Sequence, residues 1–140
     1  MKTILTLILC FAFLTIKSVE VNERNNLLND EQMQFNRFVY ALALVESRNN
    51  SEAINAKENA RGKFQIRPIR LKDYNNRTGS NYSIEQMHND SIAIKVFNYY
   101  AKGSYEQIAR NWNGGPRGMN KKSTVKYWYK VNKLLTHPLF

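Results

Sequence analysis

Apolar residues recur at helical spacing along most of this chain. One set stands at positions i, i+3, i+4 and i+7, which is one face of an amphipathic helix: Phe35, Phe38, Val39 and Leu42. The same spacing returns between Ile92 and Tyr100 and between Tyr127 and Leu135. Runs of alternating β-branched residues are absent, so a large sheet is not expected. With 140 residues, 43% of them hydrophobic, we predict an all-α, compact single-domain fold.

Capping signals predict where the helices begin. The first helix is expected to begin near Asn29 and Asp30 and to end at about Ser47. Serines three places before a glutamine form two capping-box patterns, and a helix should begin at each: Ser83 with Gln86, and Ser104 with Gln107. Asp90 is expected to cap a helix that Gly103 ends, and a last helix should run from Ser123 or Thr124 to before Pro138. The stretches Asn49 to Pro68 and Trp112 to Asn120 are expected to be loops.

The first eighteen residues differ from the rest. Lys2 is followed by an uncharged apolar stretch from Ile4 to Ile16, which is typical of a secretory signal and too short for a comfortable membrane span of about 20 residues. We therefore predict a signal peptide at 1–18, a short polar leader at 19–30 and the functional domain at 31–140. The protein is expected to be exported to the periplasm or the extracellular space, with no stable membrane insertion after signal removal.

Charge and cysteine usage narrow the possible functions. The 21 Lys and Arg residues against 11 Asp and Glu give a formal net charge of +10. This charge favours a polyanionic partner, whether nucleic acid, anionic lipid or an anionic cell-wall polymer. The single cysteine, Cys10, lies in the predicted signal, and His88 and His137 are far apart in sequence. A thiol nucleophile or a metal site is therefore poorly supported, and we expect no metal and no cofactor.

Glu46 is the strongest candidate for a catalytic group. At about 100° per residue from Phe35, Glu46 falls near 20°, in the middle of the apolar face. Burial of a carboxyl group raises its pKa, which suits a general acid that works near neutral pH. The same pattern also fits a first helix that ends at about Val45, with Glu46 solvated or paired with Arg48.

Two further segments carry polar groups suited to a sugar. Gly62 would allow close approach of backbone to a ligand, and Gln65 can donate and accept hydrogen bonds, although a packing turn with a solvated glutamine would look the same. Trp112 and Asn113 combine an aromatic face with an amide ahead of a flexible loop. Alternatively, Trp112 is a core anchor at a helix end.

Together these motifs resemble the lysozyme-like lytic transglycosylase domain of the soluble lytic transglycosylase type, which is related to goose-type lysozymes. The resemblance covers roughly residues 33 to 132. It rests on four motifs in order: Glu46-Ser47 at a helix end, Gly62-x-x-Gln65-Ile66, Trp112-Asn113-x-Gly115-Pro116, and Tyr127-x-x-x-Val131. Trp112 stands where the family usually has tyrosine, and Phe64 where methionine is common.

The resemblance implies a lysozyme-like fold and cleavage of the β-1,4 bond between N-acetylmuramic acid and N-acetylglucosamine in peptidoglycan, with 1,6-anhydro products. It implies that Glu46 is the acid and base. Ser47 and Gln65 would orient Glu46 or the N-acetyl group, and Trp112, Asn113 and Tyr127 would line the cleft. Peptidoglycan glycan strands would be the partner of a monomer, with no nucleic acid.

Two other interpretations remain. Most glycosidases use two carboxylates, and Glu58 lies where goose-type lysozymes carry an additional acidic residue, so a hydrolysing lysozyme is the alternative enzyme. Arg67 stands where such enzymes would place another acid, which favours the transglycosylase. The third interpretation is a non-catalytic peptidoglycan-binding module of the same fold. The presence of Glu46 argues against it.

Overall fold

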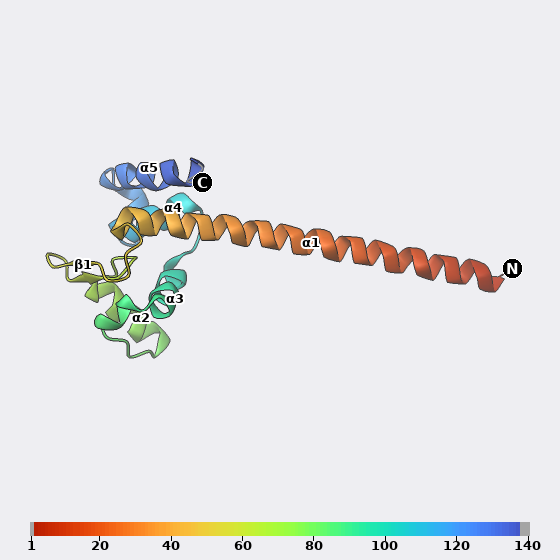
Figure 1. The fold of residues 1–140 in the computed structure, drawn as a ribbon, viewed down its shortest axis with the longest axis horizontal. Coiled ribbons are helices and arrows are strands. Elements are labelled where there is room, and N and C mark those ends of the chain that lie inside the picture. Colours follow the sequence, from red (N-terminus) through yellow and green to blue (C-terminus); the bar gives the residue numbers. More distant parts are fainter. Residues whose placement is uncertain (1, 138–140) are drawn as a thin grey trace. The chain divides into compact units, whose positions relative to one another are not determined.

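The computed structural model describes the backbone of residues 2–137 and the side chains of residues 20–137, mostly as helices (Figure 1). The elements in chain order are α1 (Lys2–Ser47), β1 (Ile54–Asn55), β2 (Ala60–Arg61), α2 (Pro68–Thr78), η1 (Glu85–His88), α3 (Asp90–Tyr100), α4 (Tyr105–Gly114), η2 (Gly118–Asn120) and α5 (Ser123–Thr136). The predicted all-α class is confirmed, since the strands in the described residues are two residues long each. The chain divides into an N-terminal unit, Met1–Asn36, and a C-terminal unit, Arg37–Phe140.

The N-terminal unit is helical from Lys2 onward, whereas the sequence predicted a helix that begins near Asn29. Asn29 and Asp30 lie inside α1 with exposed side chains and cap nothing. The chain has neither glycine nor proline before Gly62, so no residue of this unit breaks a helix by its backbone preference. Among the described residues, no helix has both the length and the apolar character needed to cross a membrane.

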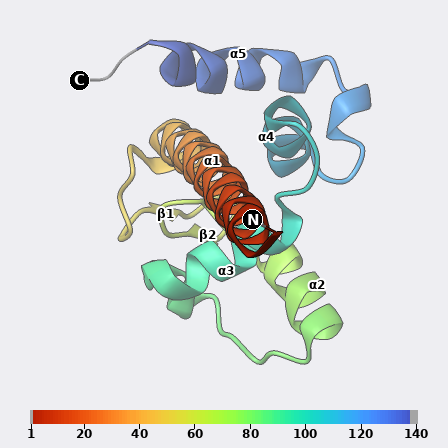
Figure 2. The ribbon, with the colours of Figure 1, turned by 90° about the vertical axis from the view of Figure 1, so that its right-hand side faces the viewer.

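The C-terminal unit forms its core around the last turns of α1. Phe38 and Leu42, from the predicted apolar face, are completely buried. Phe64 stacks on Phe97 of α3 with ring centroids 4.8 Å apart. Within this unit α5 packs against α4, and α5 lies on the opposite side of the end of α1 from α2 and α3 (Figures 1 and 2). The end of α1 is therefore enclosed by helices from later in the chain.

The capping predictions are partly confirmed. Ser104 begins α4 with a complete capping box to Gln107, as expected. The cap of α3 is Asn89, whose side chain accepts from the Ile92 backbone N–H, so the assignment to Asp90 was wrong by one residue. The helix expected at Ser83 is only η1, four residues of 3-10 helix. Asn89 is both the last cap of η1 and the first cap of α3. Its extended backbone cannot continue η1, so that element ends there.

The two predicted loops contain short regular elements. In the first, β1 pairs antiparallel with β2, and in the second, α4 continues to Gly114 before η2. Gly62 follows β2 with φ +74°, and a Cβ at this position would lie 2.0 Å from the Met87 carbonyl oxygen. Only glycine fits there, because both the left-handed backbone and the close approach exclude a side chain. Because Gly62 has no side chain, the turn between β2 and α2 can lie directly against Met87 of η1.

Candidate functional site

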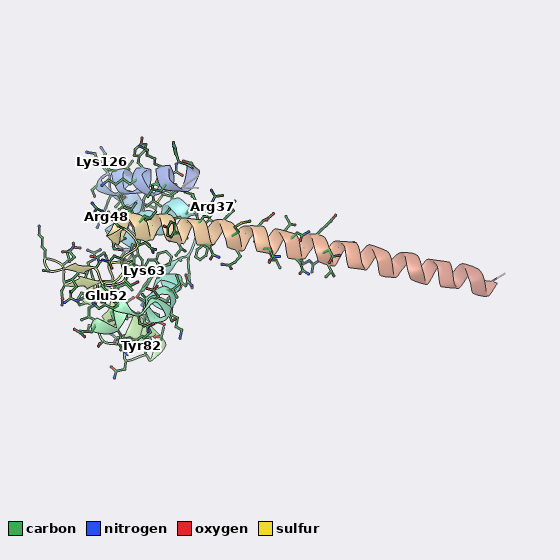
Figure 3. The ribbon with its side chains drawn as sticks, viewed as in Figure 1. Arg37, Arg48, Glu52, Lys63, Tyr82 and Lys126 are labelled. Carbon is green, nitrogen blue, oxygen red and sulfur yellow. The ribbon has the colours of Figure 1, made fainter. Side chains whose placement is uncertain are left out.

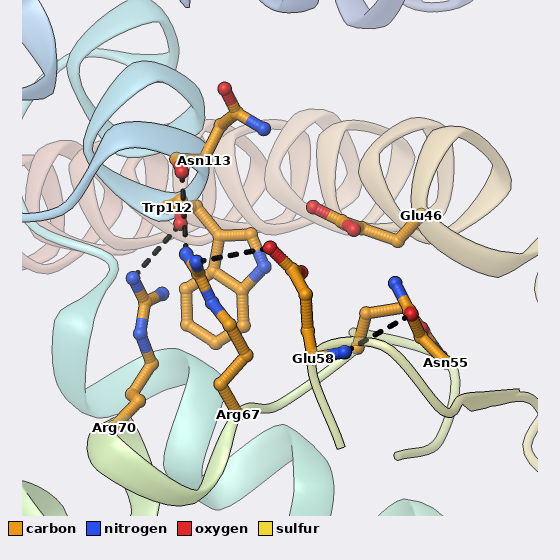
Figure 4. A pocket seen from close by; sticks show the side chains of 8 residues that line it. Glu46, Asn55, Glu58, Arg67, Arg70, Trp112 and Asn113 are labelled. Carbon is orange, nitrogen blue, oxygen red and sulfur yellow. Dashed lines mark hydrogen bonds and ion pairs between the residues drawn. The ribbon is translucent and has the colours of Figure 1, made fainter. Parts of the chain in front are cut away.

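A polar pocket lies in the C-terminal unit, where the end of α1, the β1–β2 hairpin, α2 and α4 converge (Figure 4). Its empty space, with the solvent at its mouth included, is about 480 Å³. Eight residues line it: Glu46, Asn55, Glu58, Gln65, Arg67, Arg70, Trp112 and Asn113. Four of the six predicted site residues are thus brought together around one pocket.

Glu46 enters this pocket from the last turn of α1, one turn after the buried Leu42. The Tyr127 hydroxyl of α5 donates a hydrogen bond of 2.7 Å to Glu46 Oε1. Burial raises the pKa of the Glu46 carboxyl to about 7, although the Tyr127 bond and the charges of Arg70 and Arg67 act in the opposite direction. Near neutral pH, Glu46 is therefore present both as an acid and as a carboxylate.

Tyr127 remains a proton donor throughout this range. Burial, together with the neighbouring Glu46, raises the pKa of the Tyr127 hydroxyl well above its ordinary value. The hydroxyl therefore stabilises the Glu46 carboxylate by a charge-assisted hydrogen bond without competing for the proton. The two residues are 81 positions apart in sequence, and the packing of α5 beside α1 is what joins them.

Two arginines complete one wall of the pocket: Arg70 of α2, and Arg67, which directly precedes that helix. Neither was predicted as a site residue. Arg70 Nη2 donates to the Trp112 carbonyl oxygen at 2.9 Å, and its guanidinium lies 3.9 Å from the centre of a Trp112 ring. Burial lowers the pKa of Arg70 to about 10, so it is still cationic at neutral pH. Arg67 Nη2 donates to the Asn113 carbonyl oxygen at 3.3 Å. Pro68 at the first turn of a helix is the local signal that could have indicated α2.

Trp112 lines the pocket but offers little surface to a ligand. Its side chain is only 5% exposed, because its indole N–H donates to the Phe64 carbonyl oxygen and its edge packs on Phe97. Arg70 covers one face of the ring. The core-anchor alternative therefore describes Trp112 better than the expected open stacking platform, whereas the neighbouring Asn113 is exposed.

Gln65 and Ser47 have different positions relative to the pocket. Gln65 lines it with φ +49°, and its amide nitrogen donates to the Gly62 carbonyl oxygen at 2.9 Å. Ser47 is not among the lining residues. Its hydroxyl donates to the Lys63 carbonyl oxygen at 2.9 Å and accepts from the Asn50 backbone N–H at 3.0 Å. Ser47 thus ties the end of α1 to the Gly62–Ile66 turn, and its hydroxyl is engaged by backbone instead of facing a ligand.

Glu58 reaches the same pocket from the turn between β1 and β2 (Figure 4). Its side chain is 50% exposed, and Oε1 lies 3.6 Å from Arg67 Nη1. Its backbone N–H donates to the Asn55 side chain at 3.3 Å, which shapes the turn. Across the described part of the chain, no cluster of three or more His, Cys, Asp or Glu side chains could hold a metal ion.

A buried carboxyl group whose pKa lies near neutral is the kind of group that lysozyme uses as its general acid. The family model described as the Transglycosylase SLT domain matches residues 27–134, and the chain belongs to this family. This confirms the resemblance and the lysozyme-like fold, and it implies cleavage of the glycan strands of peptidoglycan. No curated protein and no solved structure matches the chain significantly.

Proposed function

We propose that the protein is a lytic transglycosylase in which Glu46 is both the acid and the base. The observation that carries the proposal is the environment of Glu46, whose pKa is raised to about 7 by burial while Tyr127 holds Oε1 at 2.7 Å. A general acid works best when its pKa lies near the operating pH. The substrate is the β-1,4 bond between N-acetylmuramic acid and N-acetylglucosamine.

The reaction needs one carboxyl group in two successive states. Protonated Glu46 gives its proton to the glycosidic oxygen as the bond from that oxygen to C1 of the muramic residue breaks. The resulting Glu46 carboxylate then accepts the proton of the C6 hydroxyl, and O6 forms a bond to C1. The product is a 1,6-anhydro ring, no water is consumed, and Glu46 ends protonated. A pKa near 7 makes both transfers favourable, because neither state of Glu46 is strongly preferred.

The residues in and around the pocket supply substrate binding and the positioning of Glu46. The amides of Gln65 and Asn113 are suited to the N-acetyl and hydroxyl groups of the sugars. Tyr127 orients the Glu46 carboxyl group and stabilises its charged state. Trp112 contributes through Arg70, which it holds beside the pocket, and Ser47 acts by fixing the turn that carries Gln65.

The cellular setting is proposed from the sequence. Residues 1–18 direct export to the periplasm or the extracellular space, residues 19–30 are a leader, and residues 31–140 act as a monomer without a cofactor. Peptidoglycan strands are the partner, with neither nucleic acid nor stable membrane insertion involved.

Glu58 supports a second candidate function, hydrolysis by a goose-type-like lysozyme. It lines the same pocket as Glu46, and two carboxylates that flank a sugar could activate water. Its ion pair with Arg67 favours a role in binding over that of a base, because the carboxylate already has the arginine as its partner.

The deciding experiment is mass spectrometry of the muropeptides that the protein releases from purified peptidoglycan. We expect products one water lighter than hydrolysis products, with anhydro ends, and no release by Glu46→Gln. Reducing ends would establish hydrolysis instead. Absence of release by the unaltered protein, with retained binding, would establish a binding module.

A further inference from the structure

We propose that the outer face of α5 binds the acidic peptide stems of the glycan strand that the pocket cleaves, an inference that rests on the proposed function. Four lysines define this face, which we name the α5 lysine stripe: Lys122, Lys126, Lys130 and Lys133. Three of them belong to α5 and Lys122 directly precedes it. All four side chains are exposed, and Lys126 is labelled in Figure 3.

The stripe follows from the helical geometry of α5. At about 100° per residue the four lysines fall within an arc of about 80°. Thr124 and Val131, which are buried, lie on the opposite side of the helix. The stripe is about 16 Å long at 1.5 Å per residue, so it presents a row of cations to a chain-like ligand.

In the part of the chain that the structure describes, no carboxylate side chain is paired with this row. Seven Lys or Arg residues follow Glu106 in the sequence, but no Asp or Glu does. Among the described side chains, the ion pairs involve none of the four lysines. An uncompensated row of like charges repels itself and gains free energy from an anionic partner, so the ligand is expected to be acidic.

The position of the stripe favours the substrate over other polyanions. Tyr127, which contacts Glu46, lies about 60° around α5 from Lys130 and one turn before it. A strand held at Glu46 therefore passes beside α5, where the carboxylates of its stems can reach the lysines. A bilayer is a poorer fit, because Val125 and Tyr129 are the exposed large apolar side chains of α5 and form too narrow a surface for insertion.

The test measures binding with Glu46→Gln as background, so that the polymer stays intact. Its ligands are peptidoglycan freed of nucleic acid and phosphodiester polymers, and the same material after an amidase has removed the stems. The stripe variant carries Lys126→Gln, Lys130→Gln and Lys133→Gln. A control of equal charge carries Lys72→Gln, Lys95→Gln and Lys102→Gln, all exposed on other parts of the unit. An arginine version of the stripe variant keeps the charge.

We expect the stripe variant to bind stem-bearing peptidoglycan roughly tenfold more weakly, since each exposed ion pair contributes a fraction of 1 kcal/mol. The charge-matched control and the arginine version should bind normally, and binding to the stripped glycan should not change. Equal binding by the stripe variant and its control would overturn the proposal. So would an equal loss on the stripped glycan. Every variant compared carries Glu46→Gln, so a failure of the stripe appears as a missing difference in binding, whereas a failure of the proposed function appears as release of muropeptides by Glu46→Gln alone.

Discussion

Glu46 and Glu58 line one pocket from two regions of opposite character. Glu46 stands on a helix end enclosed by the core, with Tyr127 as its hydrogen-bond donor. Glu58 stands on a two-residue-strand hairpin, half exposed and paired with Arg67. Burial raises the pKa of Glu46 to about 7. The same chemical group can therefore hold a proton near neutral pH in one region, while in the other it faces solvent beside an arginine.

This difference predicts very unequal effects of matched substitutions. Glu46→Gln removes the transferable proton but keeps the shape of the side chain. We expect it to slow release of muropeptides about 1,000-fold or more, which is within the usual contribution of a general acid. Glu58→Gln should keep the rate within about tenfold. Initial rates on purified peptidoglycan measure both, and comparable losses in the two variants would show that the reaction needs two carboxylates.

The raised pKa of Glu46 also predicts how stability depends on pH. The pKa is about 7 in the folded protein, against an ordinary value of 4.5 for a glutamate carboxyl, so the folded state binds the proton more tightly. The free energy of unfolding should therefore fall as the pH rises from about 4.5 to about 7, by about 3 kcal/mol from this group. Glu46→Gln should remove this fall, and Glu58→Gln should retain it. Urea unfolding at pH 4.5 and pH 8 tests the difference, and a wild-type-like slope in Glu46→Gln would contradict it.

The turn that carries Gln65 depends on Gly62. Gly62→Ala should destabilise the protein by about 3 kcal/mol for two reasons. The new Cβ would clash with the Met87 carbonyl oxygen, and alanine rarely adopts the positive φ angle of this position. Gly79→Ala is the matched control, with φ +70° and no atom within 4 Å of the new Cβ. It should cost about 1 kcal/mol. Thermal unfolding measures the stability of the two variants. Equal losses of stability would mean that the positive φ angle alone causes the destabilisation.

Much of this site follows from local patterns in the sequence. The spacing that buries Phe38 and Leu42 also directs Glu46 toward the interior, and Ser104 with Gln107 begins α4 as its capping box requires. These features depend on neighbours within one or two turns. Local patterns were therefore sufficient to direct Glu46 into the pocket and to predict most helix positions.

The parts that were not predicted have weak local signals or depend on packing between distant segments. In α2, Ile69 is 77% exposed, which leaves Leu71 and Tyr74 as a weak periodic signal, so the helix that carries Arg70 was not predicted. Trp112 became a core residue because the Phe64 carbonyl, 48 positions away, accepts its N–H. A hydrogen bond between residues so far apart leaves no periodic pattern in the sequence.

Tyr127→Phe tests how the enclosed region sets the proton affinity of Glu46. The lost hydrogen bond stabilised the carboxylate, so the pKa of Glu46 should rise further. The fall of kcat/KM at high pH (the high-pH limb) should therefore move to higher pH by about one pH unit. Tyr129→Phe on the exposed face of α5 is the matched control and should leave the limb in place. A pH–rate profile measures both. An unchanged limb in Tyr127→Phe would show that this bond does not tune the acid.

Glu58→Gln should shift the same limb in the opposite direction, and by less. The negative charge of Glu58 raises the pKa of Glu46 and contributes the least of the causes that act on it. Its removal also leaves Arg67 without its carboxylate partner, so more positive charge faces the pocket. Both changes favour the Glu46 carboxylate, and activity should be lost at a lower pH than in the unaltered protein. A loss of activity at every pH would instead make Glu58 a direct participant and favour hydrolysis. An upward shift would mean that Glu58 acts on Glu46 through the shape of the hairpin and not through its charge.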